Sequence, residues 1–440
     1  MQRKWRCSQL RRVLRDIGEG SSAGRRLGAL GLALALLVTW LTLASLLNPP
    51  PQIGGTEIRY VVNPASVDKC LKVWDFGSNV ICKTQQRYVP SLGAKAWKPA
   101  TAFTPTVQYG PEPETPSINF KLHGRGSFTG SGVVVAVVDT GIDYTHPAFQ
   151  NAILEIWTVL YVSESGEFLH WVMGVNGSIK DLLALDQGLK DSYGEYAFAD
   201  ECGHGTHVAG IIAGRPVGDF VGFAPSAKLF IVKAFWKNGT AGMDMVLDAL
   251  KIVYDNADRL GIKVVNLSWG ALLNSDGSDP ISVAAASLAE KDILVFAAAG
   301  NEGNLPFKIL SPAVHEDVIA LGAADPYTGK VAPFSSWGTT VDLRMKPDFV
   351  AAGVSILSAR SSFSSLTPWD KDERLTYASG TSMSAAVASG IGAQFAEYWM
   401  KSGKKESLRE AFLKFENNIA ERYNPYYKDF VTGRGILIPP

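Results

Sequence analysis

Short apolar runs alternate with amphipathic stretches from about residue 117 onward. The short runs predict strands buried on both faces of a sheet, and the stretches in which apolar residues recur every three or four positions predict helices. The expected strands cover 133–138, 228–235, 263–269, 292–299 and 317–323, and the expected helices cover about 205–214, 241–260, 279–291, 383–399 and 406–420. This alternation is typical of an α/β fold with a mostly parallel central sheet.

A segment without any charged residue, 27–47, follows a basic leader at the start of the chain. At about 1.5 Å per helical residue this segment is long enough to cross the hydrocarbon core of a bilayer. Residues 1–26 carry eight basic and two acidic side chains, which predicts a cytoplasmic N-terminus and export of the remaining chain. We expect a single-pass signal anchor, or a cleaved signal peptide and a secreted protein; a buried core helix is the alternative without export.

A small module precedes the α/β pattern. Residues 48–55 form a spacer, 57–62 and 73–83 look like strands, and the proline-rich stretch 97–116 looks like a linker. We therefore treat 48–116 as a spacer plus a small module, and 117–440 as one large domain.

The charges add up to zero but are unevenly placed. The 42 basic residues balance the 42 acidic ones, yet the leader carries +6 and the rest of the chain −6, so no nucleic-acid partner is expected. Four cysteines are too few for a disulfide scaffold. With Cys7 on the cytoplasmic side, Cys70, Cys82 and Cys202 are exported, and Cys70 with Cys82 is the local pair that we favour.

Three short blocks carry side chains that suit nucleophilic catalysis. In DTGID, Asp139 ends a predicted buried strand, where open α/β sheets build their sites. In DECGHGTHVAG, His204 and His207 lie near a helix start; their spacing also fits a zinc site. In GTSMS, Ser382 lies at the start of a helix of small residues, whose N–H groups could face an oxyanion.

The three blocks together indicate a catalytic triad. Serine is a weak nucleophile that needs a base within hydrogen-bond reach, and the base in turn needs a carboxylate to orient it. Asp139, His204 and Ser382 supply these groups in that chain order.

With AAAGNEG between the last two, these blocks resemble the signature segments of the subtilisin-like serine proteases, the subtilases. The resemblance covers about 117–440 and implies a subtilisin-like three-layer fold. It implies that Asp139 orients His204, that His204 is the general base, and that Ser382 forms the acyl-enzyme. The side chain of Asn301 and the backbone N–H of Ser382 would form the oxyanion hole. The resemblance places substrate-binding positions at Ser268, Trp269, Gly270, Ala298, Ala299 and Gly300.

Further expectations follow from the same resemblance. Residues 48–116 occupy the place of an inhibitory propeptide, with a stalk or permanent extension as the alternative. The 64 residues between Asp139 and His204 indicate an insertion at about 150–198 with a β-hairpin, near the rim of the site. The chemistry requires no cofactor, and structural calcium is an expectation from the family.

We therefore expect a serine endopeptidase that hydrolyses extracytoplasmic polypeptides through an acyl-enzyme. One alternative is an exopeptidase of tripeptidyl type, in which the insertion blocks one end of the cleft. The others are a catalytically inactive binding domain at the cell surface, and a zinc hydrolase built on His204 and His207. The oligomeric state, the cleavage preference and the metal ligands stay undetermined by the sequence.

Overall fold

The structure is a computed structural model of the chain. It describes residues 57–86, 92–99, 103–105, 108–109, 127–164, 167–175, 179–303, 305–403, 405–423, 431–437 and 439–440. The basic leader and the apolar segment 27–47 lie outside the described residues. Of the helices described, none is long and apolar enough to cross a membrane.

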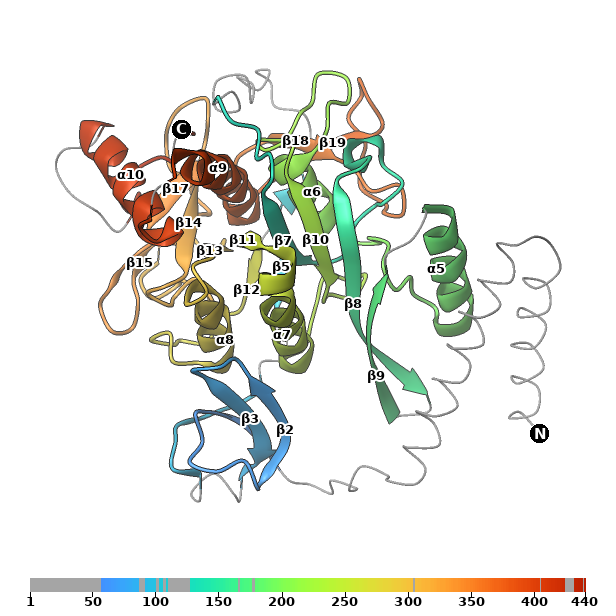
Figure 1. Cartoon of the computed structure of the whole chain (residues 1–440), viewed down its shortest axis with the longest axis vertical. Helices are drawn as coiled ribbons and strands as arrows, with labels where there is room; N and C mark the ends of the chain where they lie inside the picture. Colours follow the sequence, from blue (N-terminus) through green and yellow to red (C-terminus); the bar gives the residue numbers. More distant parts are fainter. Residues whose placement is uncertain are drawn as a thin grey trace. The chain divides into compact units, whose positions relative to one another are not determined.

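An eight-stranded sheet forms the centre of the large domain (Figure 1). Its strands, in spatial order, are β17 (Phe349–Ala352), β14 (Ile319–Ala324), β13 (Leu294–Ala298), β11 (Ile262–Leu267), β7 (Val134–Asp139), β10 (Lys228–Lys233), β8 (Ile153–Glu164) and β9 (Glu167–Val175). All neighbours are parallel except β8 and β9. The mostly parallel sheet that the sequence predicts is confirmed, and the five expected strands are five of its members.

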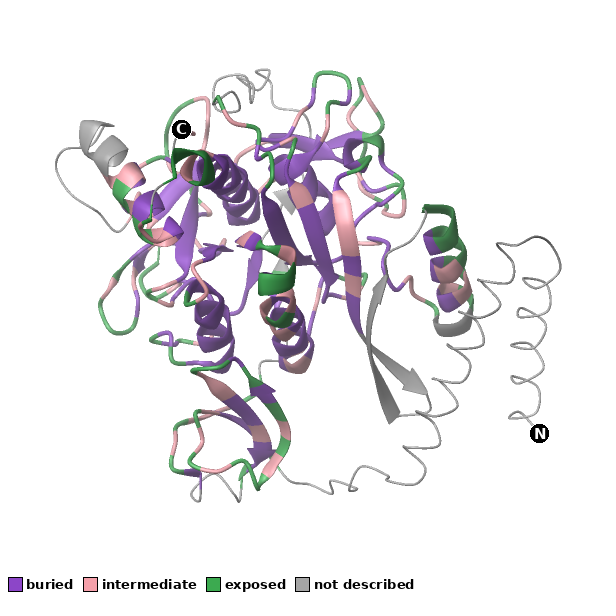
Figure 2. Ribbon diagram, viewed as in Figure 1, coloured by how far each residue is buried: buried purple, intermediate pink, exposed green. Residues whose placement is uncertain are grey.

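Helices cover both faces of the sheet, so the domain has three layers. One core contains buried residues of α6 (His204–Ala213), α9 (Thr381–Ser402) and α10 (Leu408–Tyr423); the other contains those of α7 (Met243–Leu260) and α8 (Pro280–Ala289). Along β7, Val135 and Val137 enter the first core, whereas Val134, Ala136 and Val138 enter the second. This alternation explains why the strand is apolar throughout, and Figure 2 shows the central strands of the sheet as buried.

The insertion contains the predicted hairpin and a helix that the sequence analysis missed. Strands β8 and β9 form the hairpin and extend the central sheet beyond β10. Helix α5 (Ile179–Tyr193) follows. Its buried residues Leu182, Asp186 and Leu189 recur at spacings of four and three, which is a helical signal interrupted by one carboxylate.

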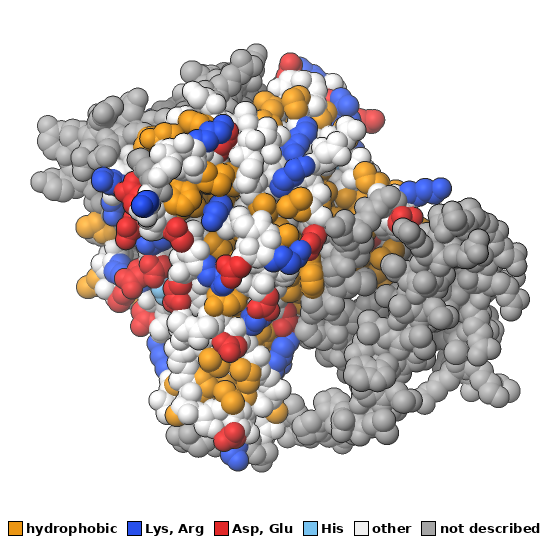
Figure 3. All heavy atoms as spheres, viewed as in Figure 1, with side chains coloured by type: hydrophobic (Ala, Val, Ile, Leu, Met, Phe, Trp, Pro, Cys, Tyr) orange, Lys and Arg blue, Asp and Glu red, His pale blue; other side chains and the backbone are white. Residues whose placement is uncertain are grey.

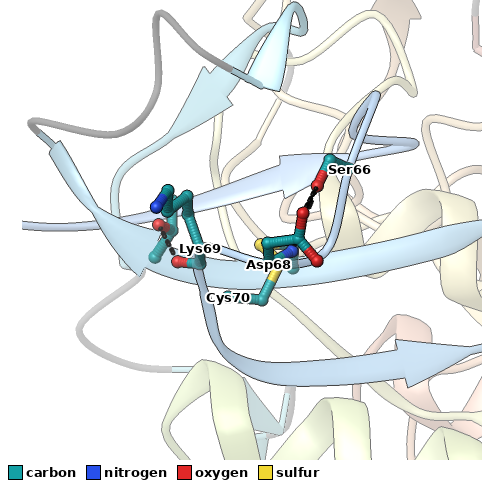
Figure 4. The surroundings of a disulfide bond; sticks show 6 residues. Ser66, Asp68, Lys69 and Cys70 are labelled. Carbon is teal, nitrogen blue, oxygen red and sulfur yellow. Dashed lines mark hydrogen bonds between the residues drawn. A yellow bond between two sulfur atoms is a disulfide. The ribbon is translucent and has the colours of Figure 1, made fainter.

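The N-terminal module is an antiparallel sheet in the order β2-β3-β1-β4. Its strands are β1 (Ile58–Val62), β2 (Cys70–Asp75), β3 (Val80–Gln85) and β4 (Ala96–Trp97). The expectation of one strand over 73–83 is wrong, because a turn in which Gly77 has φ +79° separates β2 from β3. A disulfide joins Cys70 to Cys82 across these two strands, as expected (Figure 4).

Polar contacts attach this module to α7. The Tyr60 hydroxyl donates to Asp244 (2.5 Å), and the Trp74 indole N–H donates to Asp248 (2.8 Å). The Lys72 ammonium lies 2.7 Å from the Asp248 carboxylate. Acidic and basic side chains are intermixed on the face shown in Figure 3. Asn79 also donates to Ser287 of α8 (3.1 Å), and Tyr60, Trp74 and Phe76 share an apolar core with α7 and α8, so polar contacts and apolar packing together hold the module.

Short elements complete the fold. Small sheets are formed by β12 (Trp269–Gly270) with β5 (Thr104–Pro105), by β15 (Gly338–Thr339) with β16 (Met345–Lys346), and by β18 (Ile356–Ala359), β19 (Leu375–Ser379) and β6 (Gln108–Tyr109). A 3₁₀ turn covers Pro147–Phe149.

A buried carboxylate fixes the start of the large domain. Glu397 on α9 accepts hydrogen bonds from the backbone N–H groups of Thr129 (2.8 Å), Gly130 (2.8 Å) and Ser131 (3.0 Å), and from Lys401 (2.6 Å). Burial alone would raise the pKa of Glu397, but the hydrogen bonds from Lys401 and from the backbone outweigh it and lower that pKa.

We predict that Glu397→Gln lowers the free energy of unfolding by about 1–3 kcal/mol at pH 7, because charge-assisted hydrogen bonds are lost. Folding lowers the pKa of this carboxyl, so its contribution is present above the unfolded pKa of about 4.3 and is lost as the pH falls through the folded value. Urea unfolding in a Ser382→Ala background, which prevents self-digestion, measures the difference at pH 7 and at pH 3. The exposed carboxyl of Glu316 provides the matched control, Glu316→Gln, which should change little. An equal loss in both variants would contradict this role of Glu397.

Candidate active site

Three neighbouring strands end at the candidate site. Asp139 is the last residue of β7, Ser268 follows β11, and Asn301 lies three residues beyond β13. These strands are parallel neighbours in the order β7-β11-β13, so their carboxyl ends meet at one edge of the sheet. The Trp269 indole N–H donates to the carbonyl of Val138 (2.8 Å) and ties the first two ends together.

The structure brings Asp139 and His204 into direct contact. His204 Nδ1 lies 2.7 Å from Asp139 Oδ1, and both side chains are completely buried. The backbone N–H of Thr140 donates to the same carboxylate oxygen (2.7 Å). His204 Nε2 is buried and has no hydrogen-bond partner in the described structure. An imidazole held at Nδ1 with its Nε2 unengaged is oriented to accept a proton at Nε2.

A second carboxylate fixes the start of helix α6, on which His204 is the first residue. Asp200 accepts hydrogen bonds from the backbone N–H groups of Gly203 (2.7 Å) and Thr206 (2.7 Å) and from both the Thr206 and Thr140 hydroxyls (2.7 Å each). It satisfies helix N–H donors that would otherwise lack partners. Asp200 thereby links the position of His204 to the residue that follows Asp139.

Ser382 is the second residue of α9 and contacts the end of β11. Its hydroxyl donates to the carbonyl of Ser268 (2.6 Å), and the Ser268 hydroxyl donates back to the carbonyl of Ser382 (2.8 Å). The cap position of the helix is Gly380, so Ser382 is not the N-cap. The structure thus places Ser382 at the same sheet edge as Asp139, with its hydroxyl directed to Ser268 and not to His204.

The amide of Asn301 is held by the start of the same helix. Its Oδ1 accepts from the backbone N–H and from the hydroxyl of Thr381, each at 3.0 Å. The Thr381 hydroxyl also accepts from the N–H of Gly300 (3.2 Å). Because the oxygen of the Asn301 amide is engaged by Thr381, its NH2 group is the end left to donate elsewhere.

The predicted substrate edge already pairs with a strand of this chain. β12 pairs antiparallel with β5, with Trp269 opposite Pro105 and Gly270 opposite Thr104. On the other side, Phe103 exchanges backbone hydrogen bonds with Ala241 (3.0 and 3.1 Å). The Phe103 ring is completely buried and lies edge-on to Trp269, with ring centroids 5.9 Å apart. Residues 103–105 therefore lie between β12 on one side and Ala241 on the other.

The next described residues of this segment pair with another element of the site. In β6, Gln108 pairs with Ser379 and Tyr109 with Ala378 of β19, antiparallel. Ser379 precedes the nucleophile candidate Ser382 by three residues. The described residues 103–105 and 108–109 thus pair with β12, which follows Ser268, and with β19, which ends three residues before Ser382.

The other predicted wall of the pocket is engaged within the fold. Ala299 bonds through its N–H to Leu321 (3.0 Å) and through its carbonyl to Leu310 (3.0 Å). Ala298 and Ala299 are both completely buried. Gly300 adopts φ +121°, and a Cβ there would lie 2.7 Å from Leu310. These three residues shape the approach to Asn301 by being small.

His207 and Cys202 are excluded from the chemistry by their surroundings. His207 Nε2 donates to the carbonyls of Ile356 (3.1 Å) and Thr376 (3.2 Å). Burial, and then the nearby His204, lower the pKa of His207 to about 3, so it stays neutral. Burial raises the pKa of Cys202 to about 12, so it stays a thiol. No group of three or more His, Cys, Asp or Glu side chains that could hold a metal occurs in the described parts of the chain.

Sequence reasoning did not identify the residues that position the site. Thr381 and Asp200 organise the hydrogen bonds around Asn301 and His204, and each stands close to a candidate residue in the chain. The sequence does contain a signal for each: the hydroxyl of Thr381 stands directly before Ser382, and the carboxylate of Asp200 stands four residues before His204. Phe103 gave no such signal, because its contact with Trp269 joins distant parts of the chain.

Comparison with known proteins agrees with this geometry. Residues 130–419, more than half of the chain, match the Subtilase family. The chain is 31% identical to the thermophilic serine proteinase of Bacillus sp. (strain AK1) over 68% of this chain and 60% of that protein. It is 33% identical to serine protease AprX of Bacillus subtilis (strain 168) over 61% of this chain and 57% of that protein. The chain thus spans about three fifths of the length of these two relatives. It belongs to the subtilase family of serine proteases.

Proposed function

We propose that this protein is a serine endopeptidase acting through Asp139, His204 and Ser382. The observation that carries the proposal is the completely buried contact of 2.7 Å between Asp139 and His204, whose Nε2 is left without a partner. A buried polar atom without a hydrogen bond is costly, and such atoms concentrate at functional sites. Ser382 lies at the same edge of the sheet and supplies the nucleophile.

The proposed chemistry assigns one step to each group. The Ser382 hydroxyl changes its acceptor from Ser268 to His204 Nε2 by rotation about its Cα–Cβ bond. As Oγ attacks the peptide carbonyl carbon, Nε2 takes the hydroxyl proton, and Asp139 stabilises the imidazolium that forms. His204 then gives this proton to the leaving amine, and water hydrolyses the acyl-enzyme by the same steps.

The oxyanion would be stabilised by Asn301 together with the backbone N–H of Ser382. Asn301 is fixed by Thr381, so its NH2 group is oriented before the substrate arrives. In a subtilisin, loss of one such donor costs roughly 10²- to 10³-fold in kcat.

The path of segment 103–109 favours an endopeptidase over an exopeptidase of tripeptidyl type. A cleft that accepts peptide on both sides of Ser382 is supported by the pairing of residues 104–105 with β12 and of residues 108–109 with β19. An exopeptidase needs one of these sides closed after a few residues. The insertion extends the central sheet beyond β10. This position does not support the expected place of the insertion at the rim of the site. It therefore does not support a cleft that the insertion blocks.

The same segment supports the propeptide hypothesis for residues 48–116. Residues 103–105 pair with the predicted substrate edge β12 by strand addition, a mode in which backbone hydrogen bonds give affinity and side-chain pockets give specificity. The module that precedes the segment is attached to α7 through Asp244 and Asp248. An intact chain would therefore be inhibited until the segment is cut.

Export is part of the proposal. Segment 27–47 would direct it, either as a retained anchor or as a cleaved signal, and the disulfide between Cys70 and Cys82 suits an oxidising compartment. The proposed chemistry uses no cofactor. Structural calcium, if bound, would stabilise loops through carboxylate and carbonyl oxygens and would take no part in the chemistry.

We predict that a fluorophosphonate probe labels the cut protein and that Ser382→Ala abolishes both labelling and casein digestion. A tripeptide amide should be a poorer substrate than casein, because an endopeptidase cleft binds peptide on both sides of the nucleophile. Labelling that survives the substitution would contradict the mechanism, and inhibition by a chelator without any labelling would favour a zinc hydrolase. Absence of labelling and of hydrolysis in wild-type protein that has been cut would indicate an inactive binding domain.

We also predict that Phe103→Ala exposes the cleft of the uncut chain. Truncation of a buried aromatic ring typically costs 3–5 kcal/mol, so fluorophosphonate should label the uncut chain at least about tenfold faster than wild type. A gel that separates uncut from cut chains gives both rates. Thr104→Ala, in the same strand but at an exposed side chain, is the control and should label at the wild-type rate. Equal labelling of all three chains would show that this segment does not inhibit the enzyme.

A further inference from the structure

Helix α5 of the insertion buries one carboxylate among apolar neighbours. Leu182 and Leu189 belong to the same core as α6 and α9, and Asp186 lies between them with no exposed surface. Other positions of the helix, such as Ile179 and Leu183, are exposed. A buried charge destabilises a fold unless hydrogen bonds compensate it, so the contacts of Asp186 indicate what the helix is built to hold.

Asp186 binds one turn of backbone that leads directly to the catalytic histidine. Its carboxylate accepts hydrogen bonds from three consecutive backbone N–H groups, those of Ala197 (2.5 Å), Phe198 (3.1 Å) and Ala199 (2.8 Å). The Tyr144 hydroxyl donates to it as well (3.0 Å). Successive N–H groups that converge on one anion form a rigid nest, so the position of this turn is set by α5.

A buried cation holds the opposite side of the same turn. The Lys233 ammonium, at the end of β10, donates to the carbonyls of Tyr196 (3.0 Å) and Ala199 (2.6 Å). Lys233 is completely buried. The turn is thus held between a carboxylate that accepts from its N–H groups and an ammonium that donates to its carbonyls.

The residue that follows this turn makes the hydrogen bonds that fix His204. Ala199 is followed by Asp200, which holds the first turn of α6 and the hydroxyl of Thr140. Helix α5 makes a second contact here, because Lys190 lies 3.0 Å from the Glu201 carboxylate. Glu201 also accepts from the backbone N–H of Tyr196 (3.1 Å).

We propose that α5 is a positioning helix for the general base, in which Asp186 and Lys190 set the place of His204 relative to Asp139 and Ser382. The inference rests on the proposed function and gives the insertion a role in turnover. The elements that hold segment 103–109 are β12, Ala241 and β19, none of which belongs to the insertion. Substitutions in α5 should therefore change kcat and leave KM almost unchanged.

The test compares Asp186→Asn with a matched control, each expressed as the full chain and assayed after the chain has been cut. The new amide presents an NH2 group to N–H donors, which moves the turn, and a displacement of about 1 Å at a reacting group can cost about 10²-fold in rate. We expect kcat per active site, counted by fluorophosphonate titration, to fall at least about tenfold, with KM within about twofold. Asp191 lies on the same helix, exposed, with its carboxylate paired to Gln187, so Asp191→Asn should behave as wild type.

Two outcomes would overturn the proposal. An Asp186→Asn enzyme with wild-type kcat and only a lower melting temperature would show that α5 merely stabilises the fold. A raised KM with unchanged kcat would show that the insertion restricts substrate access. A wild-type enzyme that stays inactive in the same assay after the chain has been cut would instead contradict the proposed function itself.

The second contact provides a test that does not depend on the buried carboxylate. Lys190→Glu places two acidic side chains opposite each other and should lower kcat several-fold, with KM unchanged. The control Lys190→Arg keeps a positive charge opposite Glu201 and leaves Glu201 free to accept from the Tyr196 N–H, so it should keep nearly wild-type kcat. Equal kcat in Lys190→Glu and Lys190→Arg, when both are as stable as wild type, would contradict a positioning role of Lys190.

Discussion

The hydrogen bond between Asp139 and His204 is the interaction on which the site depends. Both groups are withdrawn from water, and a buried carboxylate and imidazole are tolerated only when their polar atoms are satisfied or serve a function. The surrounding structure orients them. Thr140 donates to Asp139, and Asp200 fixes the start of the helix that carries His204. The remaining unsatisfied imidazole nitrogen, Nε2, is the one that the proposed mechanism uses.

The parallel sheet explains why these groups can meet. Its neighbouring strands β7, β11 and β13 end at one edge, so residues far apart in the chain converge there without long loops. The same edge leaves β12 available for strand addition, which the chain satisfies with its own residues 104–105. One architectural feature thus brings the candidate catalytic groups together and presents the edge with which residues 104–105 pair.

Much of this organisation could be predicted from the sequence, because it depends on local patterns. Continuous apolar runs predicted the buried strands, and the spacing of Val246, Leu250 and Val253 predicted α7. Helix α5 was missed because its buried face contains Asp186, which pattern reasoning takes for a solvent-exposed position. The occupation of β12 by residues 104–105 was missed as well, since pairing between distant segments leaves no periodic trace in a single sequence.

If Asp139 holds His204 in the orientation that activates Ser382, the variant Asp139→Asn should lose most of its turnover. The variant keeps the shape of the side chain but removes the charge, and it favours the wrong imidazole tautomer. Steady-state hydrolysis of a small peptide substrate by titrated enzyme gives kcat and KM for both proteins. The account predicts a fall of about 10⁴-fold in kcat with little change in KM. A fall of less than about tenfold in kcat would contradict it.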